Sequence, residues 1–285
     1  LKHFNGAEIS LIGSFASTEL LRHHPKVTEV NILDKKYISL LKLAKSLGKF
    51  DNFFSFRGSI RSKIFKLFVS SNHKYQFNKH LYKNLHQVDK YNNFINDSLK
   101  VNFKPGKLLI SHAIKPNIKK TTPIVGINPG ASYGDAKRWY PEKFAEVAIG
   151  LSGEFEILIF GGSGEVDIAL DIEKYLIAKN VLNYKNLSGK TSISELVEHI
   201  SKLDLFISGD SGPMHIAASF QIPTIAIFGP TRDDETSQWM NQKSIVVKKN
   251  LECQPCMKRN CPLLHHNCMK TIEVDEVLSA FKSIQ

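Results

Sequence analysis

The sequence predicts an α/β protein of two domains, each built around a parallel β-sheet. Short apolar runs of strand length alternate with segments of helical periodicity along the 285 residues, which is typical of repeated βαβ units. A polar, basic stretch bounded by prolines, "KPNIKKTTP", interrupts this alternation near residues 115–123. We therefore expect one domain at residues 1–122 and a second at residues 123–285.

The elements of the first half are the less sharply defined. Its expected strands are "AEISLIG", "VTEVNIL", "FDNFFSF" and "HKYQFN", and the segments between them, "STELLRHH", "YISLLKLAKSLG" and "SIRSKIFKLFVS", have helical character.

The second half gives clearer signals. Its expected strands "PIVGINPG", "FEILIFGGSG", "DLFISG" and "PTIAIFG" are buried runs that end in glycine-containing turns. Amphipathic helices are expected at residues 140–153, 165–180, 192–203, 213–220 and 273–285. Ligands of such sheets bind beyond the carboxyl ends of the strands, so the loops after these strands are the candidate site.

Composition and charge limit the classes of function. A hydrophobic fraction of 42% with 23% charged residues fits a soluble globular protein, and no apolar run approaches the roughly 18 residues of a membrane span. Residues 1–120 carry 22 basic and 7 acidic side chains, a net charge of +15, whereas the remainder carries −4. The first domain therefore favours an anionic partner, a generic lysine-rich surface being the alternative; no arginine-rich tract or aromatic ladder indicates nucleic acid.

The stretch "GDSGPMH" resembles a serine-protease loop, yet its context argues against a nucleophile. It lies between a strand and a helix, and Pro213 replaces the last glycine of the G-x-S-x-G elbow. We instead expect an anion cradle, in which Asp210 or Ser211 caps the helix and Gly212 lets a diphosphate approach the backbone amides. His215 in the first turn can donate to the same anion, and an ordinary capped helix is the alternative interpretation.

Two further loops follow neighbouring strands. In "NPGASYGDAKRW", Gly130 and Ser132 offer backbone amides and a hydroxyl, and Lys137 brings a positive charge. In "FGGSGE", Glu165 can accept hydrogen bonds from a ribose diol. Because no Walker A, no G-x-G-x-x-G and no D-x-D sequence occurs, we expect a nucleotide diphosphate neutralised by dipoles, Lys137 and His215, with no metal in the site and no cofactor.

These motifs resemble the bacterial ADP-heptose:lipopolysaccharide heptosyltransferases of glycosyltransferase family 9. The similarity covers residues 123–285 and rests on "NPGASYGDAKRWYPEKFAEVA", the D-S-G-x-x-H run and the later "IFGPT", with the A-K-R-W run closest to the heptosyltransferase II type. The resemblance implies a GT-B fold, two Rossmann-like domains facing a cleft, with the last helix packing back on the first domain. It also implies inverting, metal-independent transfer of heptose from ADP-heptose to the phosphorylated inner core of lipopolysaccharide. A related sugar-nucleotide transferase, or a non-catalytic nucleotide- or nucleic-acid-binding module, is the alternative.

The resemblance also implies roles for individual residues. Ser132 and Lys137 would contact phosphate or sugar, with Lys137 stabilising the leaving group; Glu165 would hold the ribose, and the backbone around Thr191 would meet the adenine. Asp210, Ser211, Gly212 and His215 would contact the diphosphate and the heptose. Family members use an aspartate in a W-x-G-D segment as general base; this sequence has no such segment, so we expect the first strand and the base to precede residue 1.

Two features leave their function open. Arg57 and Arg61 in "FRGSIRSK" are candidates for binding acceptor phosphates, solvated surface arginines being the alternative. Cys253, Cys256, Cys261 and Cys268 follow a C-x2-C-x4-C-x6-C spacing, which is compatible with a bound metal, local disulfides or free thiols. Location in the cytoplasm, at the inner face of the membrane that carries the acceptor, is the expectation.

Overall fold

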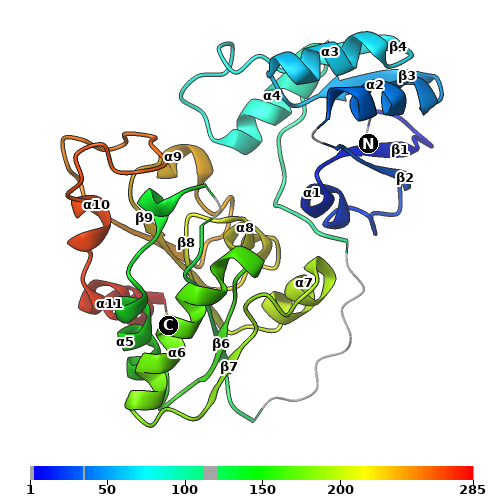
Figure 1. Ribbon diagram of the computed structural model, residues 1–285. Helices are drawn as coiled ribbons and strands as arrows, with labels where there is room; N and C mark the ends of the chain where they lie inside the picture. Colours follow the sequence, from blue (N-terminus) through cyan, green and yellow to red (C-terminus); the bar gives the residue numbers. More distant parts are fainter. Residues whose placement is uncertain (1–2, 35, 112–120, 132, 285) are drawn as a thin grey trace. The chain divides into compact units, whose positions relative to one another are not determined.

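The computed structural model describes residues 3–34, 36–111, 121–131 and 133–284. The chain divides into two compact units, Leu1–Gly106 and Lys107–Gln285. This division lies earlier in the chain than the boundary between residues 122 and 123 that composition suggested. Figure 1 traces both units in sequence colours.

The first unit alternates strands with helices, as its sequence predicts. The four expected strands are present; the helix expected at residues 17–24 is a short one that begins and ends earlier, and the helix at 87–99 was not anticipated. The elements are β1 (Ile9–Gly13), α1 (Phe15–Glu19), β2 (Val27–Ile32), α2 (Tyr37–Ser46), β3 (Phe50–Ser55), α3 (Ile60–Phe68), β4 (Ser71–Gln76) and α4 (Gln87–Leu99).

The strands of this unit pair in parallel, but in two separate sheets rather than one. Within the described residues, β1 pairs with β2 and β3 pairs with β4, with no ladder between the two pairs. Leu40 and Ala44 of α2 pack with Phe65 of α3 to form one small core, and Phe77 and Phe94 belong to another. The expectation that a further strand precedes β1 stays a prediction.

The second unit contains a six-stranded sheet with the order β10-β9-β8-β5-β6-β7, in which every pair is parallel. Its strands are β5 (Ile124–Asn128), β6 (Glu156–Ile159), β7 (Tyr184–Asn186), β8 (Leu205–Gly209), β9 (Thr224–Phe228) and β10 (Ser244–Lys248). Its helices are η1 (Asp135–Lys137), α5 (Pro141–Leu151), η2 (Ser163–Glu165), α6 (Val166–Ala178), α7 (Ile193–Ser201), α8 (Gly212–Ser219), α9 (Asp233–Thr236), α10 (Asn267–Lys270) and α11 (Val274–Ile284).

Alternate residues of the central strands face two different helical layers. Val125 and Ile127 of β5 belong to the large core beneath α5, α6 and α11, which lie together in the green-to-red part of Figure 1. Gly126 faces the other side, where Leu203 and Phe206 would be within 3 Å of an added Cβ. The sheet is therefore covered on both faces, which is why its strands are continuous apolar runs in the sequence.

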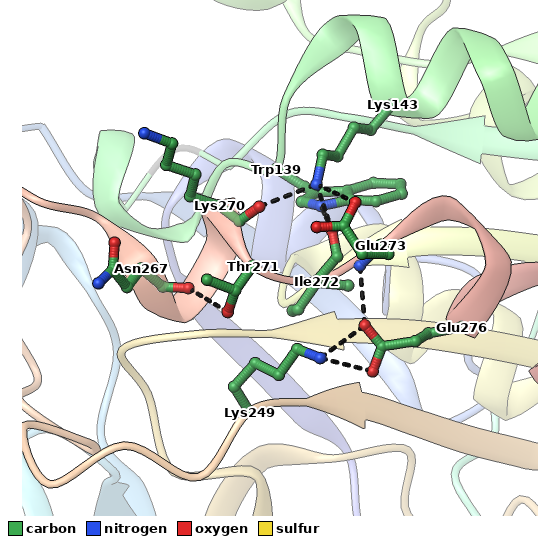
Figure 2. Close-up of polar contacts among 9 residues, drawn as sticks. All are labelled: Trp139, Lys143, Lys249, Asn267, Lys270, Thr271, Ile272, Glu273 and Glu276. Atoms are coloured by element: carbon green, nitrogen blue, oxygen red, sulfur yellow. Dashed lines mark hydrogen bonds and ion pairs between the residues drawn. The ribbon is translucent and has the colours of Figure 1, made fainter.

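The segment that joins α10 to α11 is fixed to its own unit by a cluster of polar contacts (Figure 2). Lys143 of α5 donates to the backbone oxygens of Lys270 (2.8 Å) and Ile272 (2.7 Å) and pairs with Glu273 (2.9 Å). Trp139 Nε1 also donates to Ile272 O, at 3.2 Å. Lys143 thus satisfies the carbonyl of Lys270, the last residue of α10, which the helix leaves without an intrahelical partner, and both donors serve the Ile272 carbonyl just beyond it. The packing of α11 on α5, β9 and β10 is internal to the unit, and a contact with the first unit stays a prediction.

Candidate functional site

The carboxyl end of the second sheet contains a topological switch point between β5 and β8. From β5 the chain runs to β6 and β7 on one side, and it returns to form β8 on the other side of β5. At such a point the connections leave in opposite directions and open a crevice beyond the strand ends, where α/β proteins bind their ligands. The residues that follow β5, β6, β8 and β9 are therefore the candidate site.

A polar residue stands at or next to the end of β5 and of β8, although both strands are buried. Asn128 lies opposite Ser208 in the ladder. Asn128 Nδ2 donates to Ser211 Oγ at 3.1 Å, and the hydroxyls of Ser208 and Ser211 are 2.9 Å apart. Ser211 Oγ is thus held by a buried amide and a hydroxyl, an arrangement that orients it but does not activate it as a nucleophile.

The start of α8 differs in one detail from the sequence-based expectation. Ser211 is the N-cap residue, but its side chain makes no capping hydrogen bond, because the hydroxyl is engaged by Asn128 and Ser208. The expectation that Asp210 or Ser211 would cap the helix through its side chain is therefore wrong. Gly212 begins α8, and a Cβ placed on it would meet nothing within 4 Å. His215 lies half-buried in the first turn of the same helix.

Lys137 and Asp210 form a nearly buried ion pair in this crevice. Lys137 Nζ lies 2.5 Å from Asp210 Oδ2, with side chains 12% and 6% exposed. Thr231, which follows β9, donates its hydroxyl to the same carboxylate oxygen at 2.6 Å. The ammonium also lies 4.7 Å from the centre of the Tyr133 ring, a cation–π contact. Three loops from different strands thus meet at one charged pair.

The loops after β5 and β6 also meet. A Cβ on Gly130 would lie 2.1–2.4 Å from the Glu165 carboxylate, so only glycine lets this carboxylate lie against the loop backbone. Glu165 Oε2 accepts a 2.8 Å hydrogen bond from Gly162 N. The sequence-predicted pair Gly130 and Glu165 is therefore brought together, whereas Ser132 lies outside the described residues.

The loop after β7 contributes a hydroxyl that the sequence did not single out. Ser188 is buried, and among the described residues its Oγ has no hydrogen-bond partner. An added Cβ on Gly161 would lie 2.5 Å from this oxygen and 3.3 Å from Glu165 Cβ, so Ser188 belongs to the same loop cluster. Thr191 lies half-buried just before Ser192, the N-cap of α7.

A hollow of about 470 Å³ lies next to Thr231, at the carboxyl ends of β9 and β10. Thr231, Arg232 and Lys248 are among its lining residues, and Lys248 pairs with Asp233 at 2.7 Å. This volume falls within the range that small-molecule sites commonly have.

The segment that contains the cysteines braces two of the site loops. Ala136 N donates to Arg259 O at 3.0 Å, and Tyr133 Oη donates to Met257 O at 2.8 Å. Met257 N donates in turn to Pro230 O at 2.9 Å, next to Thr231. The backbone around Lys137 and that around Thr231 are therefore tied to one common segment.

All four cysteines are free thiols in the structure, so no disulfide is formed. Burial, together with the nearby Cys256, Cys261 and Cys253, raises the pKa of the Cys268 thiol to about 11.

Comparisons with known proteins agree on one family. The model for glycosyltransferase family 9 (heptosyltransferase) matches residues 51–266. The lipooligosaccharide heptosyltransferase 2 of Campylobacter jejuni (serotype O:2) is 43% identical over 99% of this chain and 90% of its own length.

The chain belongs to glycosyltransferase family 9.

Two Escherichia coli proteins of solved structure share the fold of this family 9 chain. ADP-heptose lipopolysaccharide heptosyltransferase II superposes with a TM-score of 0.77 at 20% identity, over 99% of this chain and 91% of that one. Heptosyltransferase WaaC, solved with ADP, superposes with a TM-score of 0.77 at 11% identity, over 100% of this chain and 92% of that one. The expected α/β fold of the GT-B type and the assignment as a glycosyltransferase are both confirmed.

Sequence reasoning missed several residues of the candidate site. Asn128 and Ser208 are polar residues near the ends of otherwise apolar strands, and this break in the apolar pattern could have identified them. Thr231 belongs to the "IFGPT" motif, but the sequence alone assigned it no function. Arg57 and Arg61 lie in the first unit, after β3 and in α3.

Among the described residues, no helix combines the length and apolarity that a membrane crossing requires.

Proposed function

We propose that this chain transfers heptose from ADP-L-glycero-D-manno-heptose to the first heptose of the lipopolysaccharide or lipooligosaccharide inner core. The transfer inverts the anomeric centre and uses no metal ion. The name and the 43% identity of the Campylobacter jejuni relative support the substrate class. The observation that carries the proposal is the Lys137–Asp210 pair at the switch point, next to the start of α8.

The donor nucleotide diphosphate lies against the amides of Ser211 and Gly212. Those amides sit at the positive end of the α8 dipole, where an anion is stabilised without a metal. Lys137 supplies the remaining positive charge, and His215 donates from the first turn.

The nucleoside and sugar use the neighbouring loops. Gly130 and Ser132 complete the phosphate and sugar contacts. Glu165 accepts hydrogen bonds from the ribose diol, and the backbone at Thr191 meets the adenine. The hydroxyl of Ser188, which has no hydrogen-bond partner in the described part of the chain, is assigned to the same nucleoside. Asp210 orients Lys137 and contacts the heptose.

The chemical step is a single displacement. An acceptor hydroxyl oxygen forms a bond to the anomeric carbon while the bond from that carbon to the diphosphate oxygen breaks, and the leaving ADP keeps the bonding electrons. Lys137 and the α8 amides stabilise the charge that develops on the leaving oxygen. The acceptor proton passes to a general base.

The first unit binds the anionic acceptor. Its sequence carries the basic surplus, and Nε and Nη2 of Arg61 are buried without a hydrogen-bond partner among the described residues, as a phosphate-binding guanidinium would be before its ligand arrives. Arg57 follows β3 nearby in the sequence. These two arginines are the proposed acceptor contacts, and no nucleic acid is bound.

Helix α3 gives this unit a surface suited to a lipid bilayer. Ile60 and Leu67 are 75% and 71% exposed and lie seven residues apart on one face, with Lys63 exposed between them. Apolar side chains interspersed with lysines favour an anionic membrane surface. We place the protein in the cytoplasm, at the inner face of the membrane that holds the acceptor.

A transfer assay tests the proposal. Full-length protein receives ADP-heptose and GDP-mannose as competing donors with a heptose-bearing core acceptor, with and without added Mg²⁺ or Mn²⁺, and NMR of the product reports the anomeric configuration. Turnover with ADP-heptose that does not depend on added Mg²⁺ or Mn²⁺ is expected. Turnover with GDP-mannose alone would instead identify a related sugar-nucleotide transferase, and ADP binding without transfer would identify a binding module.

Two variants probe the site residues. Ser211→Ala should lose only part of the activity, because the backbone amide remains, whereas a nucleophilic serine would lose nearly all of it. Lys137→Met should lower kcat by about 10²-fold, the usual effect of losing one stabilising group at a developing charge. Lys137→Arg keeps the charge and serves as the matched control.

A further inference from the structure

The loop between β10 and α10, residues 249–266, contains no helix or strand. Loops of this length without regular structure are uncommon in compact domains unless they have a function of their own. Met257, Leu264 and His266 adopt left-handed backbone conformations, with φ of 55°, 59° and 52°. Side chains other than glycine seldom adopt this conformation unless the surrounding structure enforces it.

All four cysteines of the chain converge on one small cavity next to this loop. Cys253, Cys256 and Cys261 come from the loop, and Cys268 comes from α10; all four line the same space. The cavity has a volume of about 20 Å³, which is enough for one water molecule or one ion and too small for an organic ligand.

The lining of this cavity selects for a metal that prefers sulfur. Besides the cysteines it includes His265, His266 and Gln254, and its remaining residues are apolar. No carboxylate and no lysine or arginine takes part, so thiol and imidazole are the ionisable groups that face the space. Thiolate ligands favour Zn²⁺ and related soft divalent ions over Mg²⁺ or Ca²⁺.

The two histidines are already engaged by the protein, which leaves the thiols as the ligand set. His266 Nδ1 lies 3.2 Å from Tyr140 Oη, and His266 Nε2 lies 3.0 Å from Ala136 O. His265 Nδ1 accepts a 3.0 Å hydrogen bond from Asn267 N. Cys261 Sγ, by contrast, faces the cavity and accepts the backbone N–H of His266 at 3.4 Å.

Within the described residues, no three His, Cys, Asp or Glu side chains are already arranged to hold a metal ion. The sulfur atoms must therefore move toward one another as an ion binds. Three of the four cysteines are half-buried and lie in a loop without regular structure, so the proposal requires side-chain rotation and an adjustment of that loop.

We propose that Cys253, Cys256, Cys261 and Cys268 bind one thiolate-preferring divalent metal ion, with Zn²⁺ as the probe. Four protein thiolates leave no open coordination position, so the ion is structural and takes no part in sugar transfer.

The ion acts on the active site by holding the cysteine loop in place. Arg259 O of the loop accepts a hydrogen bond from Ala136 N, and Met257 N of the loop donates a hydrogen bond to Pro230 O. Its conformation therefore sets the backbone on either side of the Lys137–Asp210–Thr231 contacts. Loss of the ion is expected to raise the donor KM and to lower the midpoint of unfolding.

Metal analysis tests the proposal without an activity assay, so its outcome is independent of the proposed transfer reaction. Full-length protein, expressed with zinc and purified under reducing conditions without chelator, should contain one ion per chain by elemental analysis. Cys256→Ser should lower that content, whereas His265→Gln, which alters the same cavity but no proposed ligand, should retain it. Equal zinc content in wild type and Cys256→Ser would overturn the assignment.

A second measurement on the wild type covers the case in which Cys256→Ser does not fold. Co²⁺ added to reduced, metal-free protein should produce intense thiolate-to-cobalt charge-transfer absorption that saturates at one equivalent. A mercurial reagent should release one zinc ion per chain as four thiols react. Substoichiometric zinc together with no charge-transfer absorption would show that the four cysteines are ordinary thiols.

Discussion

Replacing Lys143 with methionine should destabilise the second unit by about 3 kcal/mol. Lys143 donates to two backbone oxygens, those of Lys270 and Ile272, and each charge-assisted hydrogen bond contributes about 1.5–3 kcal/mol. The lower end applies, because the Lys143 side chain is 18% exposed and Trp139 Nε1 still serves the Ile272 oxygen. The ion pair with Glu273, whose side chain is 64% exposed, adds less than about 1 kcal/mol.

The two tryptophans of the chain allow the second unit to be observed alone. Trp139 and Trp239 both belong to that unit, so tryptophan fluorescence during thermal or urea unfolding of the full chain does not report the first unit. For a domain of this size about 1 kcal/mol corresponds to about 2–4 °C, so Lys143→Met should lower the Tm by about 6–12 °C.

A matched lysine provides the control. Lys174 is 75% exposed and its ion pair is with Asp171 of its own helix, so Lys174→Met should leave the fluorescence midpoint unchanged within error. If the two substitutions shift the midpoint equally, the carbonyl contacts in Figure 2 do not stabilise the unit and the reasoning fails.

Three further predictions follow from single positions. Gly130→Ala should displace the Glu165 carboxylate and weaken nucleotide binding, measured by calorimetry, whereas Gly164→Ala, with open space around its Cβ, should bind normally. Gly126→Ala should cost about 1–3 kcal/mol in urea unfolding, because its Cβ would lie 2.4 Å from Leu203 Cδ1 in the core; unchanged stability would refute this. Burial, together with Lys185 and Lys202, lowers the pKa of His199 in the folded protein. Because the folded state then binds this proton less readily than the unfolded state, the unfolding free energy is highest above about pH 6.5 and falls at lower pH. His199→Gln should remove this part of the pH dependence of unfolding.

Most of the second unit could be predicted from sequence because its strands are buried on both faces. Runs such as residues 205–209 are almost continuously apolar and end in glycine, which is typical of the inner strands of a parallel sheet. The strand at residues 244–248 escaped notice because it lies at the edge of the sheet and is only partly buried. In the first unit, α4 is rich in asparagine, a weak helix former, and its place depends on packing that no local pattern reveals.

The site could be predicted in part for the same physical reason. Glycine-rich strand ends identified Gly130, Glu165 and the start of α8, since each signal is local. The partners of Asp210 are Lys137, which lies 73 residues before it, and Thr231, which lies 21 residues after it. These residues can be predicted to meet only when the order of the strands in the sheet is known. The hydroxyl of Ser211 was misassigned as a cap because Asn128, its actual partner, is likewise distant in sequence.

The Lys137–Asp210 pair also bears on how fast the enzyme can turn over. A lysine held in a nearly buried crevice without a counter-charge would bind a diphosphate tightly and would also retain the product. If the pair binds the donor as proposed, the incoming diphosphate must share the ammonium with Asp210, which lies 2.5 Å from it, and the carboxylate can pair with the ammonium again once the nucleotide leaves. Under the proposed function, the carboxylate therefore lowers the affinity for donor and product alike, which would limit product inhibition and favour exchange of spent nucleotide for the next donor.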